Sequence, residues 1–476
     1  MSQPMAVQGT RREIPPLAEV EVLVAGGGLS GVAAAVAAAR NGAKTLLVER
    51  SSILGGVATA GLMASITNFY YTDRNELVVG GIATEVVDRL AELGGTTKEW
   101  RSRSCPHYTN DPEIFKVLLI DMVLESGAQV LLDTWVVDTL VEDGALRGVI
   151  VETKGGPRAI RALVSVDTTG DADLACRAGA PYRYEPTASS SLEFRMGNVD
   201  LQKLFQYFME HPSEYPTDQD IPTSLEQLAY HWRERGLLFV PHGAGRHMQL
   251  VQEAIARGEY QRKRGVASGL DAFGMYGLAK DRTAIINSNF EVVDYLDPWE
   301  RSQAIVDAQR SIPHIAEFLR SHMPGFQDAY VAATASELGI RGTRWIEGDY
   351  VLTEQDVLDG VRFPDVVGMG AYRKKFGDRL LFLPHGFDIP YRVMLPQGIE
   401  GLLVSSGKST SSSPRGLLRG QARCLQLGEA GGAAAALAAR SGVPPRALDI
   451  RALQQRLLAQ GVYLGDAQML RERGLS

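Results

Sequence analysis

A glycine-rich segment between two apolar runs is the feature that most restricts what this chain can fold into. Residues 21–31 read EVLVAGGGLSG, and an alanine-rich run, VAAAVAAARNGA, follows them. A second apolar run, KTLLVE, ends at Glu49. Buried parallel strands read as continuous apolar runs, and the alanine-rich run is typical of a helix. The order predicts a β–α–β unit of a Rossmann-like α/β fold.

Each glycine of the GxGxxG spacing has a separate expected task in such a unit. Gly26 allows the tight turn out of the strand, Gly28 lets the backbone approach a pyrophosphate, and Gly31 lets the helix pack closely on the sheet. The N-terminus of the helix attracts phosphates, and Glu49 can accept hydrogen bonds from a ribose diol. This spacing predicts a dinucleotide site but does not distinguish a nicotinamide from a flavin.

The residues after Glu49 favour a flavin. They read ERSSILGGVATAGLM, with Gly55 and Gly56 shortly after the acid. A simple nicotinamide domain normally continues into its next helix here, whereas a glycine pair indicates a loop pressed against a larger cofactor. In this respect residues 21–61 resemble the glutathione-reductase-type FAD proteins, whose fingerprint extends past the ribose acid to a GG pair.

The β-rich runs that follow residues 113–125 predict a small antiparallel meander. Residues 113–125 read as a helix, and several β-rich runs follow, two of them joined at the hairpin signal Asp143-Gly144. The last run ends in VDTTGDADL, whose Thr168-Thr169-Gly170 resembles the ATG-like tripeptide of these FAD proteins. A calcium loop is the alternative for this acidic stretch, but the glutamate that such a loop needs at its twelfth position is missing.

The C-terminal region reads as a strand, a polar loop and a long helix, within GIEGLLVSSGKSTSSSPRGLLRGQARCLQLGEAGGAAAALAA. In the FAD proteins that it resembles, such a segment returns to the nucleotide domain and its helix N-terminus faces the flavin ring. The resemblance implies that Gly407, Lys408 and Ser409 lie along the cofactor. Arg415 and Arg419 would add positive charge near the ring or a substrate anion, or would belong to a solvated helix start.

Taken over nearly its whole length, the chain resembles the large bacterial FAD-dependent oxidoreductase family, which is distantly similar to fumarate reductase and succinate dehydrogenase flavoproteins. Further segments that carry the resemblance are GTRWIEGDYVLTEQDVLDGVRFPD and FDIPYRVMLPQGIEGLLVSSGKS. The last loop departs from the family, because SSGKS has a lysine where arginine is usual and lysine is not a bidentate fork. No histidine follows the GG pair in GGVATAGLMASITNFYY, so we expect FAD to be bound non-covalently.

The resemblance therefore implies a set of cofactor-binding residues drawn from five segments of the chain. They are Gly26, Gly28, Leu29, Ser30, Gly31, Glu49, Arg50, Gly55, Gly56, Val57, Val136, Thr169, Gly170, Asp171, Gly407, Lys408 and Arg419. No metal site is expected.

The predicted fold class is an α/β Rossmann-like FAD-binding domain, made of a parallel sheet and the meander, with an inserted α+β substrate domain. The FAD-binding domain would be discontinuous, over 15–185 and 378–476, and the inserted domain would cover 186–377. Residues 1–14 would form a flexible lead, which has no apolar core of a signal peptide. No run is apolar for the roughly 20 residues of a membrane span. We expect a cytoplasmic protein.

Three polar clusters are candidates for substrate chemistry at the flavin. They are FVPHGAGRHMQL with His242, Arg246 and His247, GIRGTRWIEGDY with Arg341 and Arg344, and LPHGFDIPYRVMLP with His385, Tyr391 and Arg392. Each has a structural alternative: surface histidines, a local ion pair of Arg344 with Glu347, or a structural strand pair. The catalytic candidates are Arg344, Tyr391, Arg392 and His385.

These expectations lead to an FAD-dependent oxidoreductase of dehydrogenase or oxidase type, which moves a hydride between a small organic substrate and flavin N5. The alternatives are a fumarate-reductase-like C=C reductase, a flavin monooxygenase, a nucleotide-binding flavoprotein without turnover, and an NAD-dependent dehydrogenase. The net charge of −7 argues against nucleic acid, including RNA, as a partner. Three distant cysteines argue against a disulfide framework or a CxxC metal site. The sequence leaves the oligomeric state open, including a homo-oligomer.

Overall fold

The computed structural model describes most of the chain. The described residues are 13–66, 77–98, 100–101, 109–215, 224–260, 273–376, 379–383 and 386–475.

The predicted β–α–β unit forms the centre of a mixed sheet. Strand β1 (Pro16–Ala25) pairs in parallel with β2 (Thr45–Val48), and helix α1 (Leu29–Arg40) connects them. The sheet order is β3-β2-β1-β6-β5-β4, with β22 paired to the end of β6. The remaining strands are β3 (Gln129–Leu131), β4 (Trp135–Glu142), β5 (Ala145–Thr153), β6 (Gly156–Asp167) and β22 (Leu402–Val404). The order confirms the predicted Rossmann-like α/β class.

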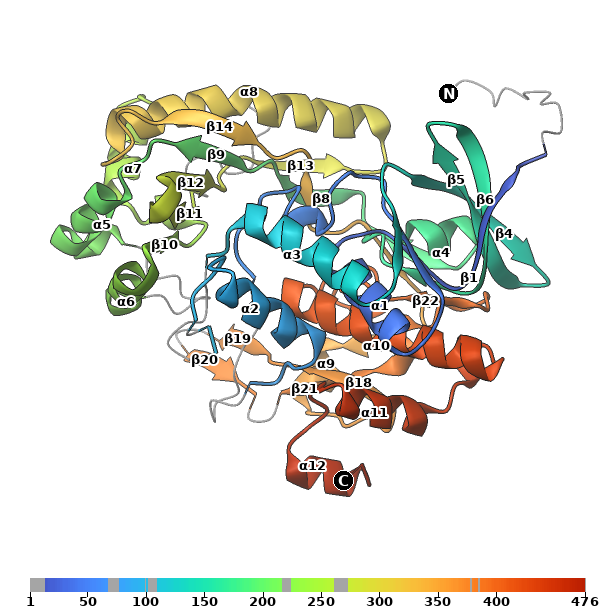
Figure 1. Ribbon diagram of the computed structural model, residues 1–476. Helices are drawn as coiled ribbons and strands as arrows, with labels where there is room; N and C mark the ends of the chain where they lie inside the picture. Colours follow the sequence, from blue (N-terminus) through green and yellow to red (C-terminus); the bar gives the residue numbers. More distant parts are fainter. Residues whose placement is uncertain are drawn as a thin grey trace.

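The antiparallel meander grows out of the same long strand. The first half of β6 pairs antiparallel with β5, whereas its second half pairs in parallel with β22. The β4–β5 turn has positive φ at both Asp143 and Gly144, as a two-residue hairpin turn requires. Figure 1 shows β4, β5 and β6 projecting together to one side of the molecule. The meander therefore leaves the carboxyl ends of the parallel strands uncovered by its own strands.

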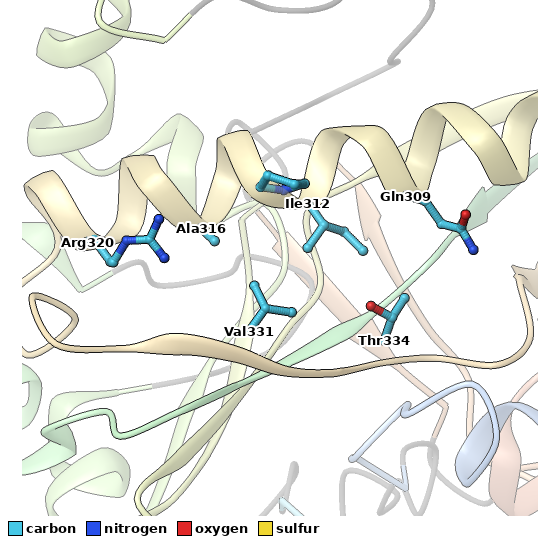
Figure 2. Close-up of a pocket in the computed structure, with 7 residues that line it drawn as sticks. Gln309, Ile312, Ala316, Arg320, Val331 and Thr334 are labelled. Carbon is cyan, nitrogen blue, oxygen red and sulfur yellow. The ribbon is translucent and has the colours of Figure 1, made fainter.

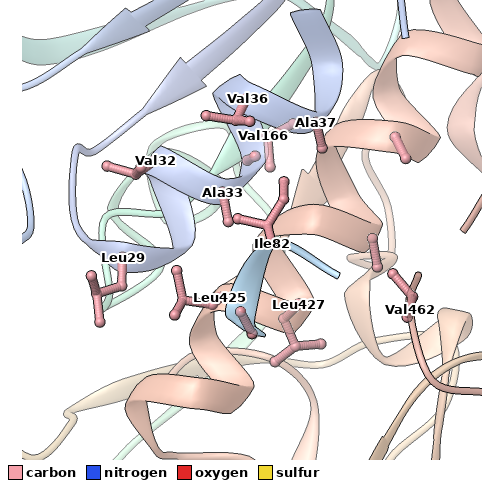
Figure 3. Close-up of a cluster of buried hydrophobic side chains, with 14 of the residues drawn as sticks. Leu29, Val32, Ala33, Val36, Ala37, Ile82, Val166, Leu425, Leu427 and Val462 are labelled. Carbon is pink, nitrogen blue, oxygen red and sulfur yellow. The ribbon is translucent and has the colours of Figure 1, made fainter. Parts of the chain in front are cut away.

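Helices α1 and α10 (Gln421–Ser441) cover one face of this sheet and lie against each other (Figure 3). A Cβ built on Gly428 would overlap the carbonyl oxygen of Ser30, and one built on Gly432 would overlap that of Ala34. The two glycines thus let the helix backbones touch. Because α10 follows β22, this packing brings the C-terminal segment back to the glycine-rich loop. Helices α2 (Ile82–Glu92) and α3 (Pro112–Glu125) complete the layer.

A second sheet has its own hydrophobic core. Its order is β10-β11-β12-β9-β14, and the long helix α8 (Pro298–His322) runs along it (Figure 1). Its strands are β10 (Leu237–Val240), β11 (Met275–Leu278), β12 (Thr283–Ile286), β9 (Phe194–Gly197) and β14 (Tyr330–Thr334). A smaller sheet has the order β13-β8-β15, and its strands are β13 (Phe290–Asp294), β8 (Thr187–Ser191) and β15 (Gly339–Ile340).

The two cores bear on the predicted domain boundaries. The core of the second sheet draws its residues from 192–340, with Leu62 and Ala64 added from the first part. Residues 352–395 contribute instead to the core that holds α1 and α10. The boundaries at 186 and 377 stay predictions, and we propose that the inserted part ends nearer residue 340.

Candidate functional site

The glycine-rich loop after β1 forms a tight turn against the end of β6. Gly26 has a φ of +103°, in the left-handed region that favours glycine, and a Cβ built there would lie 2.7 Å from the carbonyl oxygen of Thr168. A Cβ on Gly31 would overlap the carbonyl oxygen of Gly26. Both glycines are therefore required by the packing of the chain on itself.

Gly28 differs from these two, because a Cβ built there would meet no atom within 4 Å. It is also the N-cap of α1, and no side chain caps this helix end. The first turn of a helix, here at Leu29 and Ser30, holds N–H groups without intrahelical acceptors and carries the positive end of the helix dipole. A glycine without a packing reason beside an uncapped helix N-terminus fits the pyrophosphate of a bound dinucleotide.

The glycine pair after Glu49 lies directly on this loop. Gly55 forms a parallel bridge with Gly28, and its N–H donates to the carbonyl oxygen of Gly27 at 2.8 Å. Both Gly55 and Gly56 have positive φ. The loop continues toward β15, because a Cβ on Gly339 would lie 3.6 Å from the Val57 side chain. The GG loop thus connects the predicted cofactor loop to the smaller sheet.

Glu49 stands at the end of β2, where its carboxylate accepts hydrogen bonds from the backbone N–H groups of Gly27 and Ser51. Burial raises the pKa of Glu49, and these two hydrogen bonds partly oppose the rise. Each carboxylate oxygen has a second lone pair, so both can still accept a bond from a ribose hydroxyl. The neighbouring Arg50 pairs with Glu337 at 3.4 Å. Val136 of β4 is partly buried and packs against the hydrophobic core of the meander.

The loop after β6 is held by buried acids. Asp167 is 0% exposed and accepts from the N–H and hydroxyl of Thr169 and from the N–H of Ala175, at 3.0, 2.7 and 2.9 Å. Gly170 follows with a φ of +92°. Asp171 accepts from the N–H and hydroxyl of Thr343, at 3.1 and 3.0 Å. This loop therefore ties the carboxyl end of β6 to the segment after β15.

The C-terminal loop closes over the same place. The Nζ atom of Lys408 lies 3.7 Å from Asp171 and donates to the carbonyl oxygen of Ile340 at 3.3 Å. A Cβ on Gly170 would lie 3.0 Å from the Lys408 side chain, and one on Gly407 would overlap the Leu418 carbonyl oxygen. Sequence reasoning placed Lys408 in the cofactor loop but did not foresee its contact with Gly170 and Asp171.

Several polar groups of this loop are oriented inward. The hydroxyls of Ser409, Thr410 and Ser411 are buried and have no hydrogen-bond partner within the described ranges. Burial lowers the pKa of Arg419, and the neighbouring Arg341 and Arg415 lower it further. Helix α10 begins directly afterwards at Gln421, with no side-chain cap at Gly420. The donors and positive charge gathered here suit an electron-rich cofactor ring or an anion.

Two of the catalytic candidates, Arg344 and Tyr391, have protein partners in the structure. Arg344 donates to the Asp171 carbonyl oxygen at 3.0 Å and pairs with Asp173, so it secures the loop after β6. Tyr391 is 1% exposed, and its hydroxyl donates to the Pro445 carbonyl oxygen at 3.0 Å. These contacts favour structural roles for both residues, and their catalytic roles stay predictions.

Arg392 also has a protein partner in the structure. Arg392 pairs with Asp365 at 2.9 Å, and its guanidinium lies 5.1 Å from the centre of the Tyr350 ring. The predicted alternative for Arg344, Glu347, pairs with Arg183 instead. His385 lies outside the described residues. Arg392 therefore has the contacts of a structural ion pair, and a substrate contact for it stays a prediction.

Sequence reasoning missed a group of side chains on the second sheet. Glu193, in the residue before β9, is 1% exposed, and its Oε2 has no hydrogen-bond partner in the part of the chain that the structure describes. Tyr276 of β11 is 5% exposed, and its hydroxyl lies 3.3 Å from the sulfur of Met63. The one sequence signal that could have indicated this place is the acid Glu193 between the apolar residues Leu192 and Phe194.

A groove between α8 and β14 lies apart from these groups. It has a volume of about 400 Å³ and is lined mainly by Ile312, Pro313, Ala316 and Val331, with Arg320 at one end (Figure 2). The lining residues include no acid, cysteine or histidine. We do not assign it to the candidate site.

Across the described ranges, no helix is long and apolar enough to cross a membrane. The same residues contain no group of three or more His, Cys, Asp or Glu side chains that are placed to hold a metal ion.

Comparison with known proteins identifies related sequences. The family described as FAD dependent oxidoreductase matches residues 21–457. A digeranylgeranylglycerophospholipid reductase from Methanocaldococcus jannaschii is 30% identical over 184 residues, which cover 38% of this chain and 46% of that protein. A thiamine thiazole synthase from Desulfosudis oleivorans is 32% identical over 162 residues, which cover 32% of this chain and 57% of that protein. The chain thus spans about half the length of these curated relatives.

A solved structure aligns over more of the chain but at low similarity. The crystal structure of a geranylgeranyl bacteriochlorophyll reductase-like protein from Thermoplasma acidophilum covers 93% of this chain and 87% of that chain. The sequence identity is 15% and the TM-score is 0.45.

Proposed function

Because this chain belongs to the FAD-dependent oxidoreductase family, we propose that it moves a hydride between a small organic substrate and the N5 atom of bound FAD. The observation that carries the proposal is the open position of Gly28 beside the uncapped N-terminus of α1. It lies against Gly55 in the same backbone bridge. Bound FAD supplies a hydride acceptor or donor, while the chain binds, orients and shields the reactants.

We assign the cofactor contacts by segment. Gly26, Gly28 and Gly31 with the first turn of α1 receive the pyrophosphate, and Glu49 binds the adenosine ribose. The loop after β6, from Thr169 to Asp171, and the loop around Lys408 hold the ribityl chain and ring. The support is that these segments meet at the carboxyl ends of the parallel strands, where ligands of open α/β sheets bind.

The substrate would approach from the side of the second sheet. Val57 and Gly339, and likewise Asp171 and Thr343, join the cofactor loops to residues around β15. Tyr276 and Met63 form a further contact between the two parts. A substrate held at this junction is shielded from water by both cores, which strengthens the polar contacts that orient it.

A reductive direction is the second candidate, and one observation favours it. The relative from Methanocaldococcus jannaschii is named a reductase, and it matches this chain at 30% identity. In that case the substrate would carry an activated C=C bond, and external electrons would be needed. A monooxygenase reaction stays a third alternative.

Anaerobic reduction of the bound flavin tests the proposal. The purified FAD-loaded protein is mixed with amines, alcohols and saturated acids in turn, with NADH and NADPH in separate cuvettes, and flavin bleaching is followed by absorbance. Bleaching by an organic substrate supports direct oxidation, and bleaching by NAD(P)H alone supports the reductive or monooxygenase direction. A protein whose bound flavin is bleached by none of these organic substrates and by neither NADH nor NADPH would contradict hydride transfer.

A matched pair of variants separates the cofactor contact from folding. Gly28→Ala adds a methyl group where no protein atom lies, so it should fold normally and bind FAD on the order of tenfold or more weakly, a loss of about 1.4 kcal/mol. Gly155→Ala, in an exposed turn where a Cβ also fits, is the control and should bind FAD unchanged. Equal FAD affinity in both variants would show that Gly28 does not contact the cofactor.

A further inference from the structure

One face of the second sheet is turned toward the nucleotide-binding part. Arg195 of β9 reaches Glu113 of α3 at 3.1 Å, and Tyr276 of β11 reaches Met63. Side chains two residues apart in an extended segment point to the same side of a sheet. Glu193 stands two residues before Arg195, so it belongs to this same face.

Glu193 is buried at this junction, and one oxygen of its carboxyl group has no hydrogen-bond partner in the described residues. The side chain is 1% exposed, and its Oε2 finds no partner among the residues that the structure describes. The backbone of Glu193 is fixed, because its carbonyl oxygen accepts from the Ala335 N–H at 2.9 Å. A buried carboxyl oxygen without a partner costs free energy, so its presence needs an explanation by strain, water or ligand.

Arg341 brings a guanidinium to the same place from the smaller sheet. Its N–H donates to the Ser189 carbonyl oxygen at 3.1 Å, and its Nη1 donates to the Ser189 hydroxyl at 3.0 Å. Its Nη2 lies 3.4 Å from Nε2 of the exposed His242, which marks the side open to solvent. Arg341, Glu193 and Tyr276 influence one another electrostatically, as expected for neighbouring groups.

The protonation states make this group a set of donors. Burial raises the pKa of Glu193 well above its usual range, and Arg341 offsets the rise only in part. Burial likewise raises the pKa of Tyr276, so the phenol keeps its O–H at neutral pH. The raised pKa of Glu193 favours its protonated form, whose O–H can donate, and a guanidinium has donors only.

We propose that Glu193, Tyr276 and Arg341 form the polar end of the substrate site and that this end receives a carboxylate of the substrate. The inference rests on the proposed function, since it names the substrate class of that site. A carboxylate accepts hydrogen bonds through both oxygens and donates none, so it complements a set of donors from three strands or loops. Its planar shape also matches the fork of a guanidinium.

The first test is binding of small acids and their amides to the FAD-loaded protein. Acetate, benzoate and phenylacetate are titrated beside acetamide, benzamide and phenylacetamide, and the flavin absorption spectrum reports occupancy. We expect at least one acid to shift the spectrum with an affinity on the order of tenfold or more above that of its amide. An amide that binds as well as its acid, or a spectrum that none of the acids changes, would overturn the proposal.

Variants assign the effect to named side chains. Arg341→Gln should weaken acid binding on the order of tenfold or more, and Arg341→Lys should restore part of it because the charge returns. Glu193→Gln keeps a neutral donor of the same shape and should bind the acid within about threefold of the wild type. Arg161→Gln, an exposed pair with Glu142, is the control and should leave binding unchanged.

Infrared spectroscopy tests the protonation of Glu193 without any substrate. The wild type at neutral pH should show the carbonyl band of a buried protonated carboxyl, which shifts in deuterated water and is absent from Glu193→Gln. An ionised Glu193 would overturn the donor set. Failure of the proposed function would look different, because the flavin would then not be bleached while these binding and infrared results could still be obtained.

Discussion

Asp167 in the nucleotide-binding part and Glu193 beside the second sheet are both buried carboxyl groups, but their surroundings differ. Asp167 accepts hydrogen bonds from Thr169 and Ala175, which hold the loop after β6. Glu193 has an oxygen without a partner in the described parts of the chain. In the first region, groups of the chain itself donate hydrogen bonds to Asp167, so the loop does not need a ligand to satisfy this acid. In the second region we infer that a ligand completes the set.

In the nucleotide-binding part, the largest loss of stability is expected for Gly31→Ala. The new Cβ would overlap the Gly26 carbonyl oxygen and lie 2.9 Å from the Thr168 hydroxyl, so β1, α1 and the end of β6 must separate. We expect a loss of about 3 kcal/mol in the free energy of unfolding, at the upper end of the range for overpacking, and loss of bound FAD. Urea unfolding followed by circular dichroism measures the first, and absorbance of the purified protein the second.

The control for this variant is Gly155→Ala, where a Cβ meets only side-chain atoms at 3.5 and 3.7 Å. It should unfold at the same urea concentration as the wild type. If Gly31→Ala did so too, the close packing of α1 on Gly26 would not be needed.

A pair of acid-to-amide changes compares the two regions directly. Asp167→Asn places an NH₂ group against at least one N–H or O–H donor, which should cost about 2 kcal/mol of stability. Glu193→Gln should change stability by less than about 0.5 kcal/mol, because the raised pKa favours a neutral carboxyl and one of its oxygens has no partner in the described residues to lose. Thermal or urea unfolding of both variants at neutral pH gives the comparison. Equal losses would mean that the two acids are buried in the same way.

Glu429 extends the comparison to pH. This acid of α10 accepts from the Ile82 N–H at 2.8 Å, with Arg40 and Glu85 nearby, and burial raises its pKa to about 8. A raised pKa means that the folded state holds a proton that the unfolded state has lost. The stability from this group is therefore present at low pH and is lost as pH rises through about 8, with a slope of up to about 1.4 kcal/mol per pH unit.

Glu429→Gln removes this titration while its amide oxygen still accepts from Ile82. We expect the wild type to lose stability relative to the variant between about pH 5 and pH 8, measured by urea unfolding at several pH values. Parallel curves for the two proteins would show that Glu429 does not titrate in this range.

A smaller effect than that of Asp167→Asn is expected for Tyr391→Phe. The change removes one hydrogen bond to Pro445, so stability should fall by about 1 kcal/mol. The rate of anaerobic flavin reduction should stay the same, because the hydroxyl is buried among core residues. A rate loss of about tenfold or more with normal stability would return Tyr391 to the active site.

The sequence predicted the regions in which local spacing decides the structure. The β–α–β unit, the hairpin at Asp143-Gly144 and helix α3 follow from apolar periodicity and turn residues, and the structure has them close to the expected bounds. The sequence predicted that the GG pair lies against the cofactor, and the Gly28–Gly55 bridge puts the pair beside the glycine-rich loop.

The contacts between distant segments could not be read in this way. Lys408 meets Gly170 and Asp171 only because α10 packs on α1 and returns its preceding loop to β6. The alternation in IPYR gives no sign that Tyr391 faces the core and Pro445. Glu193 and Tyr276 come together through the pairing of β9, β12 and β11, which no spacing in the sequence reveals. Sheet order and helix packing decided these positions.

Release of the cofactor by acid precipitation tests whether FAD is held non-covalently by the loop that contains Gly28. FAD in the supernatant is measured for the wild type, Gly28→Ala and Glu193→Gln, each purified in the same way. We expect stoichiometric, fully released FAD for the wild type and Glu193→Gln, and clearly less FAD for a folded Gly28→Ala. FAD retained by Gly28→Ala but lost from Glu193→Gln, or flavin that stays in the protein pellet, would contradict this expectation.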